Sequence, residues 1–181
     1  MQDTLSLSGK HALVCGASAG IGRAAALSMA SLGADVTVLA RREERLAELV
    51  PQLLSAGASA ARGLAADLED RPALARYVDA LLVDHGPIHV LVNNTGGPPS
   101  GPILDATEDD FLVALGRHLL ASHQLVRAVV PGMVAAGYGR IVNVISLSVR
   151  EPIVGLGVSN TVRGAMASWA KTLSKELPPQ I

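Results

Sequence analysis

The residues best suited to catalysis lie in the C-terminal half of the chain. Ser146 follows the apolar run RIVNVI, and Ser159 and Arg163 lie four residues apart in VSNTVRGAM. Serine hydroxyls can hold the oxygen of a carbonyl or alcohol, and an arginine adds a positive charge but cannot relay a proton. His118, in a long predicted helix, has an imidazole that ordinarily titrates near pH 6.5. These groups can bind and polarise an oxygen, with His118 as the candidate proton source.

A glycine pattern near the N-terminus is suited to binding phosphate. Gly16, Gly20 and Gly22 lie in CGASAGIG, between the first predicted strand and the first predicted helix. Glycines there permit a tight turn and a close approach to a pyrophosphate, and the helix N-terminus around Ile21 supplies free N–H donors. The alternative is a turn that merely needs small residues. The strand–turn–helix context favours a dinucleotide site.

Two arginines follow the second predicted strand, where such a site selects its cofactor. An acidic residue at this position binds the ribose 2′-hydroxyl of NAD, whereas arginine accommodates the 2′-phosphate of NADP. Arg41 and Arg42 come before the first acid, Glu43. Cations are mildly unfavourable at a helix N-terminus, so a binding role is preferred over a solvated helix start. The sequence predicts NADP(H), with NAD(H) less favoured and Ser18 as an added phosphate ligand.

Short β-rich runs alternate with longer helical runs. The predicted strands are 11–15, 35–40, a third ending near 66, 89–93 and 140–145, and the predicted helices are 21–32, 42–56, 71–85, 107–136 and 158–177. We expect Thr107 to cap the fourth helix and Pro131 to kink it. This alternation is typical of right-handed crossovers and a parallel sheet covered on both faces. With no internal repeat or linker, it predicts one doubly wound α/β domain over residues 1–181.

Composition excludes several classes of function. The net charge is −1 without a run of like charge, which argues against a nucleic-acid or membrane-surface partner. No stretch approaches the roughly 18 apolar residues of a membrane span, and no signal peptide is recognisable. Cys15 is the single cysteine, and no Cys/His cluster has the spacing of a zinc site, so we predict no bound metal. A reducing, cytoplasmic setting is expected.

These motifs together resemble the classical short-chain dehydrogenase/reductase family, whose 3-oxoacyl-carrier-protein reductases are among the nearest relatives. The matching residues are Gly16, Gly20, Gly22, Asp67, Leu68, Asn93, Asn94, Thr95, Gly96 and Ser146. The resemblance implies a Rossmann fold, with the acid after the third strand at the adenine and the Asn-Asn-Thr-Gly segment along the cofactor. Thr95 replaces the alanine of the family.

The resemblance also implies a catalytic Asn, Ser, Tyr and Lys, of which this chain keeps one. Ser146 matches, while the tyrosine, lysine and asparagine positions hold Ser159, Arg163 and His118. Tyr77 and the tyrosine before the fifth strand lie too far from this site to substitute. His118 either relays a proton or simply fills the space of the asparagine.

Two functions follow. In the first, the protein is an NADP(H)-dependent oxidoreductase acting on a small carbonyl or alcohol, with Ser146 and Ser159 holding the oxygen and Arg163 the ribose. In the second, it is a catalytically weak dinucleotide-binding protein, acting as a sensor or partner subunit. The loop that encloses the substrate in this family follows a sixth strand. Because the sequence stops after KELPPQI, we expect it to be part of a longer protein.

Two helices suggest self-association. Apolar residues on more than one helical face indicate burial beyond one sheet face. They are Leu112, Leu115, Leu119 and Val126 in 111–130, and Met166, Trp169 and Leu173 in 158–177. In the resembling family these two helices form the main subunit contact, which implies a homodimer or homotetramer.

Overall fold

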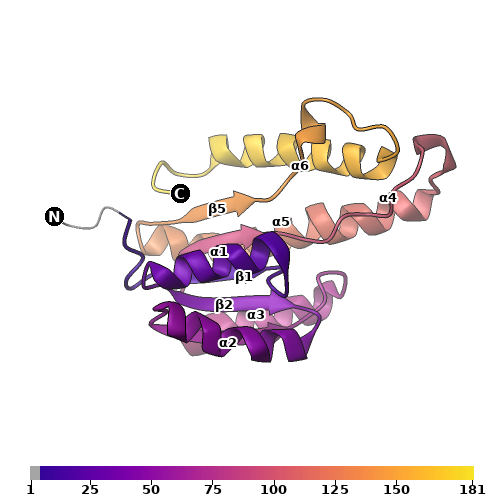
Figure 1. The fold of residues 1–181 in the computed structure, drawn as a ribbon. Helices are drawn as coiled ribbons and strands as arrows, with labels where there is room; N and C mark the ends of the chain where they lie inside the picture. The colour runs from indigo at the N-terminus through magenta and orange to yellow at the C-terminus, as the bar shows by residue number, and fades with distance from the viewer. Residues whose placement is uncertain (1–4) are drawn as a thin grey trace.

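The computed structural model describes residues 5–181, which form a five-stranded parallel sheet with helices on both faces (Figure 1). The strands are β1 (His11–Cys15), β2 (Asp35–Ala40), β3 (Ala60–Ala65), β4 (Val90–Asn93) and β5 (Arg140–Asn143). The α-helices are α1 (Gly20–Ser31), α2 (Glu43–Ala56), α3 (Arg71–His85), α4 (Glu108–Leu115), α5 (Ala121–Ala135) and α6 (Gly157–Glu176). Three short segments, η1 (Ile103–Asp105), η2 (Gly116–Leu120) and η3 (Leu147–Val149), complete the chain. The predicted fold class is confirmed.

The sheet has the strand order β3-β2-β1-β4-β5, so the chain crosses from one side of β1 to the other between β3 and β4. Ala12 in β1 is in register with Val36 of β2 and with Val90 of β4. Open α/β sheets bind ligands outside the carboxyl ends of the strands, where the strand order reverses. That place is beside β1 and β4, on the right of Figure 1, toward which the strand arrows point.

Alternate residues of β1 face two separate aliphatic cores. Leu13 and Cys15 pack with residues of α3, α5 and α6, while Ala12 and Val14 pack with residues of α1 and α2. All four side chains are fully buried. A central parallel strand covered on both faces reads as a continuous apolar run, as HALVC does.

The long predicted helix contains a π-helical segment that the sequence did not predict. Thr107 forms the predicted cap, as part of a capping box with Asp110. Between α4 and α5 lies η2, a π-helical segment in which the N–H of Ala121 donates to the carbonyl of Gly116. The helix widens there at Gly116, a residue of low helix propensity. Pro131 lies within α5 without ending it, and the kink predicted at Pro131 stays a prediction.

The fifth strand is two residues shorter than predicted. β5 ends at Asn143 because its only neighbour in the sheet, β4, ends at Asn93, and the last ladder bond joins the N–H of Val144 to the carbonyl of Asn93. Val142 is 47% exposed, so β5 is an open edge among the described strands. Ser146 consequently lies in the loop beyond the strand and not at its end.

The amino edge of the sheet holds a buried polar network. Arg62 forms a bidentate ion pair with Asp35, at 2.7 and 3.0 Å, and contacts Thr37 at 3.1 Å. The Nε2 of His11, a residue only 4% exposed, lies 2.7 Å from the hydroxyl of Thr37 and 3.1 Å from Arg62. Because the guanidinium can only donate, His11 accepts at Nε2 and is neutral. Burial, as the largest cause, lowers the pKa of His11 from 6.5 to about 4.

Candidate functional site

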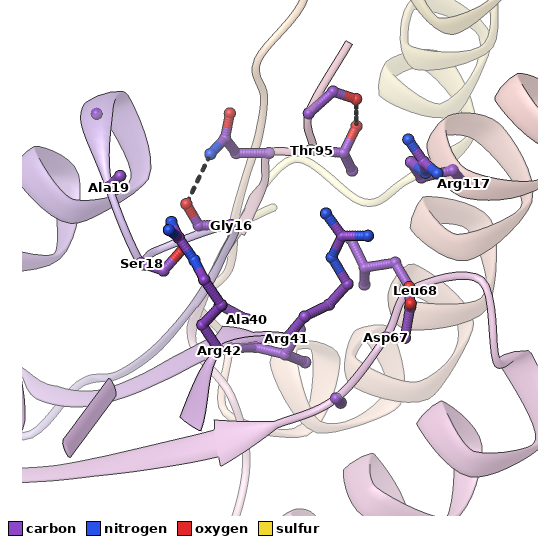
Figure 2. A pocket seen from close by; sticks show the side chains of 15 residues that line it. Gly16, Ser18, Ala19, Ala40, Arg41, Arg42, Asp67, Leu68, Thr95 and Arg117 are labelled. Atoms are coloured by element: carbon purple, nitrogen blue, oxygen red, sulfur yellow. Dashed lines mark hydrogen bonds between the residues drawn. The ribbon is translucent and has the colours of Figure 1, made fainter. Parts of the chain in front are cut away.

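A cavity of about 680 Å³ opens at the carboxyl ends of β1, β2, β3 and β4 (Figure 2). Of the residues predicted to bind the cofactor, ten line it: Gly16, Ser18, Gly20, Arg41, Arg42, Asp67, Leu68, Asn94, Thr95 and Gly96. Residues about 80 positions apart in the sequence thus meet at one site, the one expected for a ligand in this type of sheet.

The glycine turn forms the floor of the cavity through close backbone contacts. Gly16 has a φ of +61°, and a Cβ there would lie 2.6 Å from the carbonyl oxygen of Asn94. A Cβ on Gly22 would lie 2.8 Å from the Asn94 amide nitrogen. Only glycine fits at both positions.

Two of the residues predicted to bind the cofactor, Ile21 and Gly22, do not line the cavity. Gly22 lets helix α1 pack against the turn, and Ile21 is 64% exposed. These residues can contribute only through the backbone of the first turn of α1.

The segment that follows β4 is hydrogen-bonded to the glycine turn. The Asn94 side-chain amide lies 3.3 Å from the carbonyl oxygens of Cys15 and Gly16, to which it donates. These bonds, one of which is drawn in Figure 2, hold the chain after β4 against the chain after β1. The wall formed by Thr95 and Gly96 is thereby fixed relative to the floor.

The two arginines after β2 have different surroundings. Figure 2 shows the Arg41 side chain rising into the cavity, whereas Arg42 lies toward the glycine turn. The Arg42 guanidinium donates to the Ser18 hydroxyl at 3.0 Å. The pairing of Ser18 with a cation agrees with the predicted phosphate site, since both groups are donors to an anion.

One cavity residue, Arg117, was not foreseen from the sequence. It faces Asp67 and Leu68 across the cavity and forms an ion pair with Glu69, its Nε lying 2.5 Å from the carboxylate. Arg117 lies in η2, next to His118, and the π-helical turn places both side chains toward the strand ends. The only sequence signal for it was its position beside a candidate catalytic residue.

His118 lies behind the cavity wall and is 2% exposed. Its Nδ1 is 2.5 Å from the Thr95 hydroxyl, so the two departures from the resembling family contact each other. Burial, followed by the charges of Arg163 and Arg117, lowers the pKa of His118 to about 4, against an opposing hydrogen bond with the Gly96 backbone. The expectation that His118 titrates near neutral pH is therefore wrong, because an imidazolium would be buried beside two arginines.

The other three catalytic candidates lie beyond β5 and do not line the cavity. The Ser146 Oγ accepts a hydrogen bond from the Ser148 N–H at 3.1 Å and caps η3. Ser159 lies in the first turn of α6 and is partly buried. Arg163, one turn later, donates to the Val144 carbonyl at 2.8 Å, which anchors α6 to the end of β5.

Within residues 5–181, three or more His, Cys, Asp or Glu side chains never gather as they would around a metal ion. The helices of the same region are all too short or too polar to cross a membrane.

The sheet order, with a cavity at its crossover point, defines a Rossmann-type nucleotide-binding fold. Residues 10–181 match the family described as short chain dehydrogenase, and the chain belongs to that family. A short chain dehydrogenase of Pseudocercospora fijiensis is 34% identical over 173 residues, which cover 94% of this chain and 56% of that protein. The ketoacyl reductase HetN of a Nostoc species is 29% identical over 172 residues, covering 95% of this chain and 60% of that protein.

Solved structures agree with the assignment. The L-sorbose reductase of Gluconobacter frateurii, complexed with NADPH and L-sorbose, superposes with a TM-score of 0.90 at 29% identity, over 95% of this chain and 65% of that one. An NAD⁺-bound xylitol dehydrogenase superposes with a TM-score of 0.88 at 30% identity, over 96% and 67%. The relatives thus include proteins seen with either cofactor, and the chain spans little more than half of the first relative.

Proposed function

We propose that the chain is the cofactor-binding part of an NADP(H)-dependent oxidoreductase that transfers hydride between the nicotinamide and a small carbonyl or alcohol. The observation that supports this best is the pair of arginines after β2. Arg41 lines the cavity and Arg42 bonds to Ser18, at the position where an acid would favour NAD. The NADPH complex of the sorbose reductase is consistent with this choice, and the NAD⁺ complex of the xylitol dehydrogenase is the competing precedent.

The residues present fit such a cofactor. Gly16 and Gly22 leave the backbone bare where a pyrophosphate would approach, and Asp67 and Leu68, which line the cavity, would contact the adenine. Thr95 and Gly96 would flank the dinucleotide along its length. A bound nicotinamide supplies or accepts the hydride, and the protein contributes binding and orientation.

We propose that Ser146 and Ser159 hold the substrate oxygen. The Ser146 hydroxyl accepts a hydrogen bond from the Ser148 N–H and keeps its own proton to donate to another partner. Arg163 would bind the cofactor ribose with guanidinium nitrogens not used on Val144. His118 would orient the Thr95 hydroxyl as a neutral imidazole, a positioning role and not that of an acid. The proton that the substrate oxygen gains on reduction, or loses on oxidation, would then be exchanged with solvent water.

A catalytically weak dinucleotide-binding protein is the second candidate. It is favoured by one observation, namely that none of Ser146, Ser159, Arg163 and His118 offers an acidic proton at neutral pH. Serine and arginine lose protons far above neutrality, and His118 is already deprotonated. Such a site could bind NADP(H) and release it unchanged.

A measurement of turnover distinguishes the oxidoreductase from the catalytically weak binding protein. The full-length protein is assayed with a panel of carbonyls and alcohols, with NADPH and NADP⁺, by absorbance of the reduced nicotinamide. For an enzyme, Ser146→Ala lowers kcat with little change in cofactor affinity. Arg163→Ala weakens cofactor affinity by about 1.5–3 kcal/mol, and Arg163→Lys keeps much of it. Cofactor binding without turnover of any substrate would favour the binding protein.

We propose a reducing, cytoplasmic setting for the protein. Cys15 is fully buried in β1, and burial raises the pKa of its thiol to about 12. A buried neutral thiol is inert and forms no disulfide.

A further inference from the structure

The chain between Ser146 and Ser159 contains a loop that is not held in place by burial. Residues 150–156, which follow η3, belong to no helix or strand, and the first five of them are all exposed. Ile153 is 45% exposed and Val154 is fully exposed, so neither side chain packs in a core. A loop with few buried contacts opens easily unless hydrogen bonds hold it. The path of the chain between the two serines is therefore set mainly by hydrogen bonds.

Asn160 binds this loop with both groups of its side-chain amide. Its Nδ2 donates to the carbonyl of Ile153 at 2.8 Å, and its Oδ1 accepts from the N–H of Ile153 at 3.4 Å. The same Ile153 carbonyl accepts from the N–H of Leu156 at 3.2 Å, which closes the turn before α6. Asn160 directly follows Ser159 in the first turn of α6. The amide therefore connects the loop to the helical turn that carries Ser159.

The loop is also joined to the segment that follows β4. The N–H of Gly101 donates to the carbonyl of Gly155 at 2.6 Å, and its carbonyl accepts from the N–H of Gly157 at 3.1 Å. A Cβ on Gly157 would lie 2.5 Å from the Cα of Ile103, so the two segments are in close contact. The segment after β4 begins at the cavity wall that contains Thr95. Loop 150–156 thus lies between Ser159 and a segment that continues from the cofactor cavity.

We propose that Asn160 is a positioning residue, which fixes loop 150–156 and thereby sets the Ser159 hydroxyl relative to that of Ser146. This inference rests on the proposed oxidoreductase function, in which both hydroxyls hold the substrate oxygen. A displacement of about 1 Å in groups that orient a reacting atom can lower a rate about a hundredfold. Asn160 does not line the cavity at the strand ends, so its loss should impair the substrate side of the site and spare cofactor affinity.

Three substitutions at this position distinguish the hydrogen bonds from the space that the side chain fills. Asn160→Asp has the same size but cannot donate to the Ile153 carbonyl, Asn160→Ala loses both bonds, and Asn160→Gln keeps both groups on a longer side chain. With the most active substrate of the panel and the full-length protein, Asn160→Asp and Asn160→Ala should each lower kcat/KM about tenfold, and Asn160→Gln should recover part of the loss. Calorimetry should give the same NADP⁺ affinity for all three.

The matched control removes a side-chain hydrogen bond elsewhere on the same helix. The Thr172 hydroxyl donates to the Ser168 carbonyl at 3.1 Å, and Thr172→Ala should leave kcat/KM unchanged. Hydrogen exchange adds a measurement that does not depend on turnover. Asn160→Asp and Asn160→Ala should accelerate exchange of the Ile153 N–H about tenfold while the N–H groups of β1 stay protected.

Four outcomes would overturn the inference. If Asn160→Asp keeps full activity, the side chain only fills space, and the proposed function stands. If NADP⁺ affinity falls together with kcat/KM, Asn160 acts through the cofactor and not through the substrate. Unchanged exchange at Ile153 would show that the amide does not hold the loop. If the unaltered protein binds NADP⁺ but turns over no substrate of the panel, the proposed function fails and the positioning role fails with it. Circular dichroism of each variant verifies folding.

Discussion

Acid should destabilise the protein through two buried histidines, and His118→Asn isolates one of them. The pKa of His118 is lowered to about 4 in the folded state, against about 6.5 in the unfolded chain. Between these pH values the unfolded state binds more protons than the folded state, so stability falls as pH falls. The loss begins below about pH 6.5 and is complete below about pH 4, where it reaches roughly 3 kcal/mol at about 1.36 kcal/mol per pH unit.

The magnitude can be worked out at two convenient pH values. Between pH 7 and pH 5, a histidine with these two pKa values loses roughly 2 kcal/mol of folding free energy. His11, with a folded pKa also lowered to about 4, contributes a similar loss from the amino edge of the sheet. His11 and His118 together should therefore cost the unaltered protein roughly 4 kcal/mol. His118→Asn should lose roughly 2 kcal/mol less, because the contribution of His118 is then absent.

Urea unfolding at pH 7 and pH 5 measures these differences directly. His123→Asn is the matched control, since His123 is exposed on α5, and it should lose as much stability on acidification as the unaltered protein. The reasoning is refuted if His118→Asn loses as much as the control. His118 would then not be buried and neutral in the folded state.

Three further outcomes are expected. Gly22→Ala should weaken cofactor binding tenfold or more by calorimetry, because the methyl group would meet the Asn94 amide at 2.8 Å; Gly164→Ala, with open space around it, should leave binding unchanged. Thr107→Ala should cost about 1 kcal/mol in urea unfolding through loss of the capping box, and an unchanged midpoint would argue against it. Light scattering at micromolar concentration should give the mass of a dimer or tetramer, and a monomeric mass would contradict the predicted self-association. Leu112→Glu, at a residue that is 64% exposed, should reduce the assembly to monomers.

The prediction of assembly rests on fewer residues than the sequence suggested. Val126 and Met166 are buried within the chain, at about 3% exposure each, and so need no partner. Self-association is now supported mainly by the exposed side chains of Leu112, Val113 and Leu120. A helical pattern cannot distinguish burial under a neighbouring helix of the same chain from burial under a second subunit.

The strands β1, β2 and β4 were predictable because each is a short apolar run, and the alternation with helices predicted the parallel arrangement. The third strand, AARGLA, contains Arg62 and Gly63, and only its end near residue 66 was predicted. Element ends were less predictable. β5 stops where β4 stops, a limit set by hydrogen bonding between strands and not by its own residues. The π-helical turn at η2 is fixed by contacts of Arg117 and His118 with loops distant in sequence. No local signal in the sequence indicates such a turn, because Arg117 and His118 are ordinary residues for an α-helix.

The cofactor side of the site was predictable, and the catalytic side was not. Glycines and arginines act through backbone shape and charge, which the sequence displays directly. The state of His118 depends on burial and on Arg163, 45 positions later, neither of which is visible in the chain around it. Arg117 was overlooked because an isolated arginine on a helix is ordinarily a solvated surface residue.

The central claim, that the arginines after β2 select NADP(H), is tested most directly by the affinities of NADP⁺ and NAD⁺ for the full chain. Calorimetry on the unaltered protein should give at least tenfold tighter binding of NADP⁺. In the double variant Arg41→Gln/Arg42→Gln, NADP⁺ affinity should fall at least tenfold while NAD⁺ affinity is kept, since charge-assisted contacts to a phosphate contribute at most a few kcal/mol. Equal affinity for the two cofactors in the unaltered protein would contradict the claim.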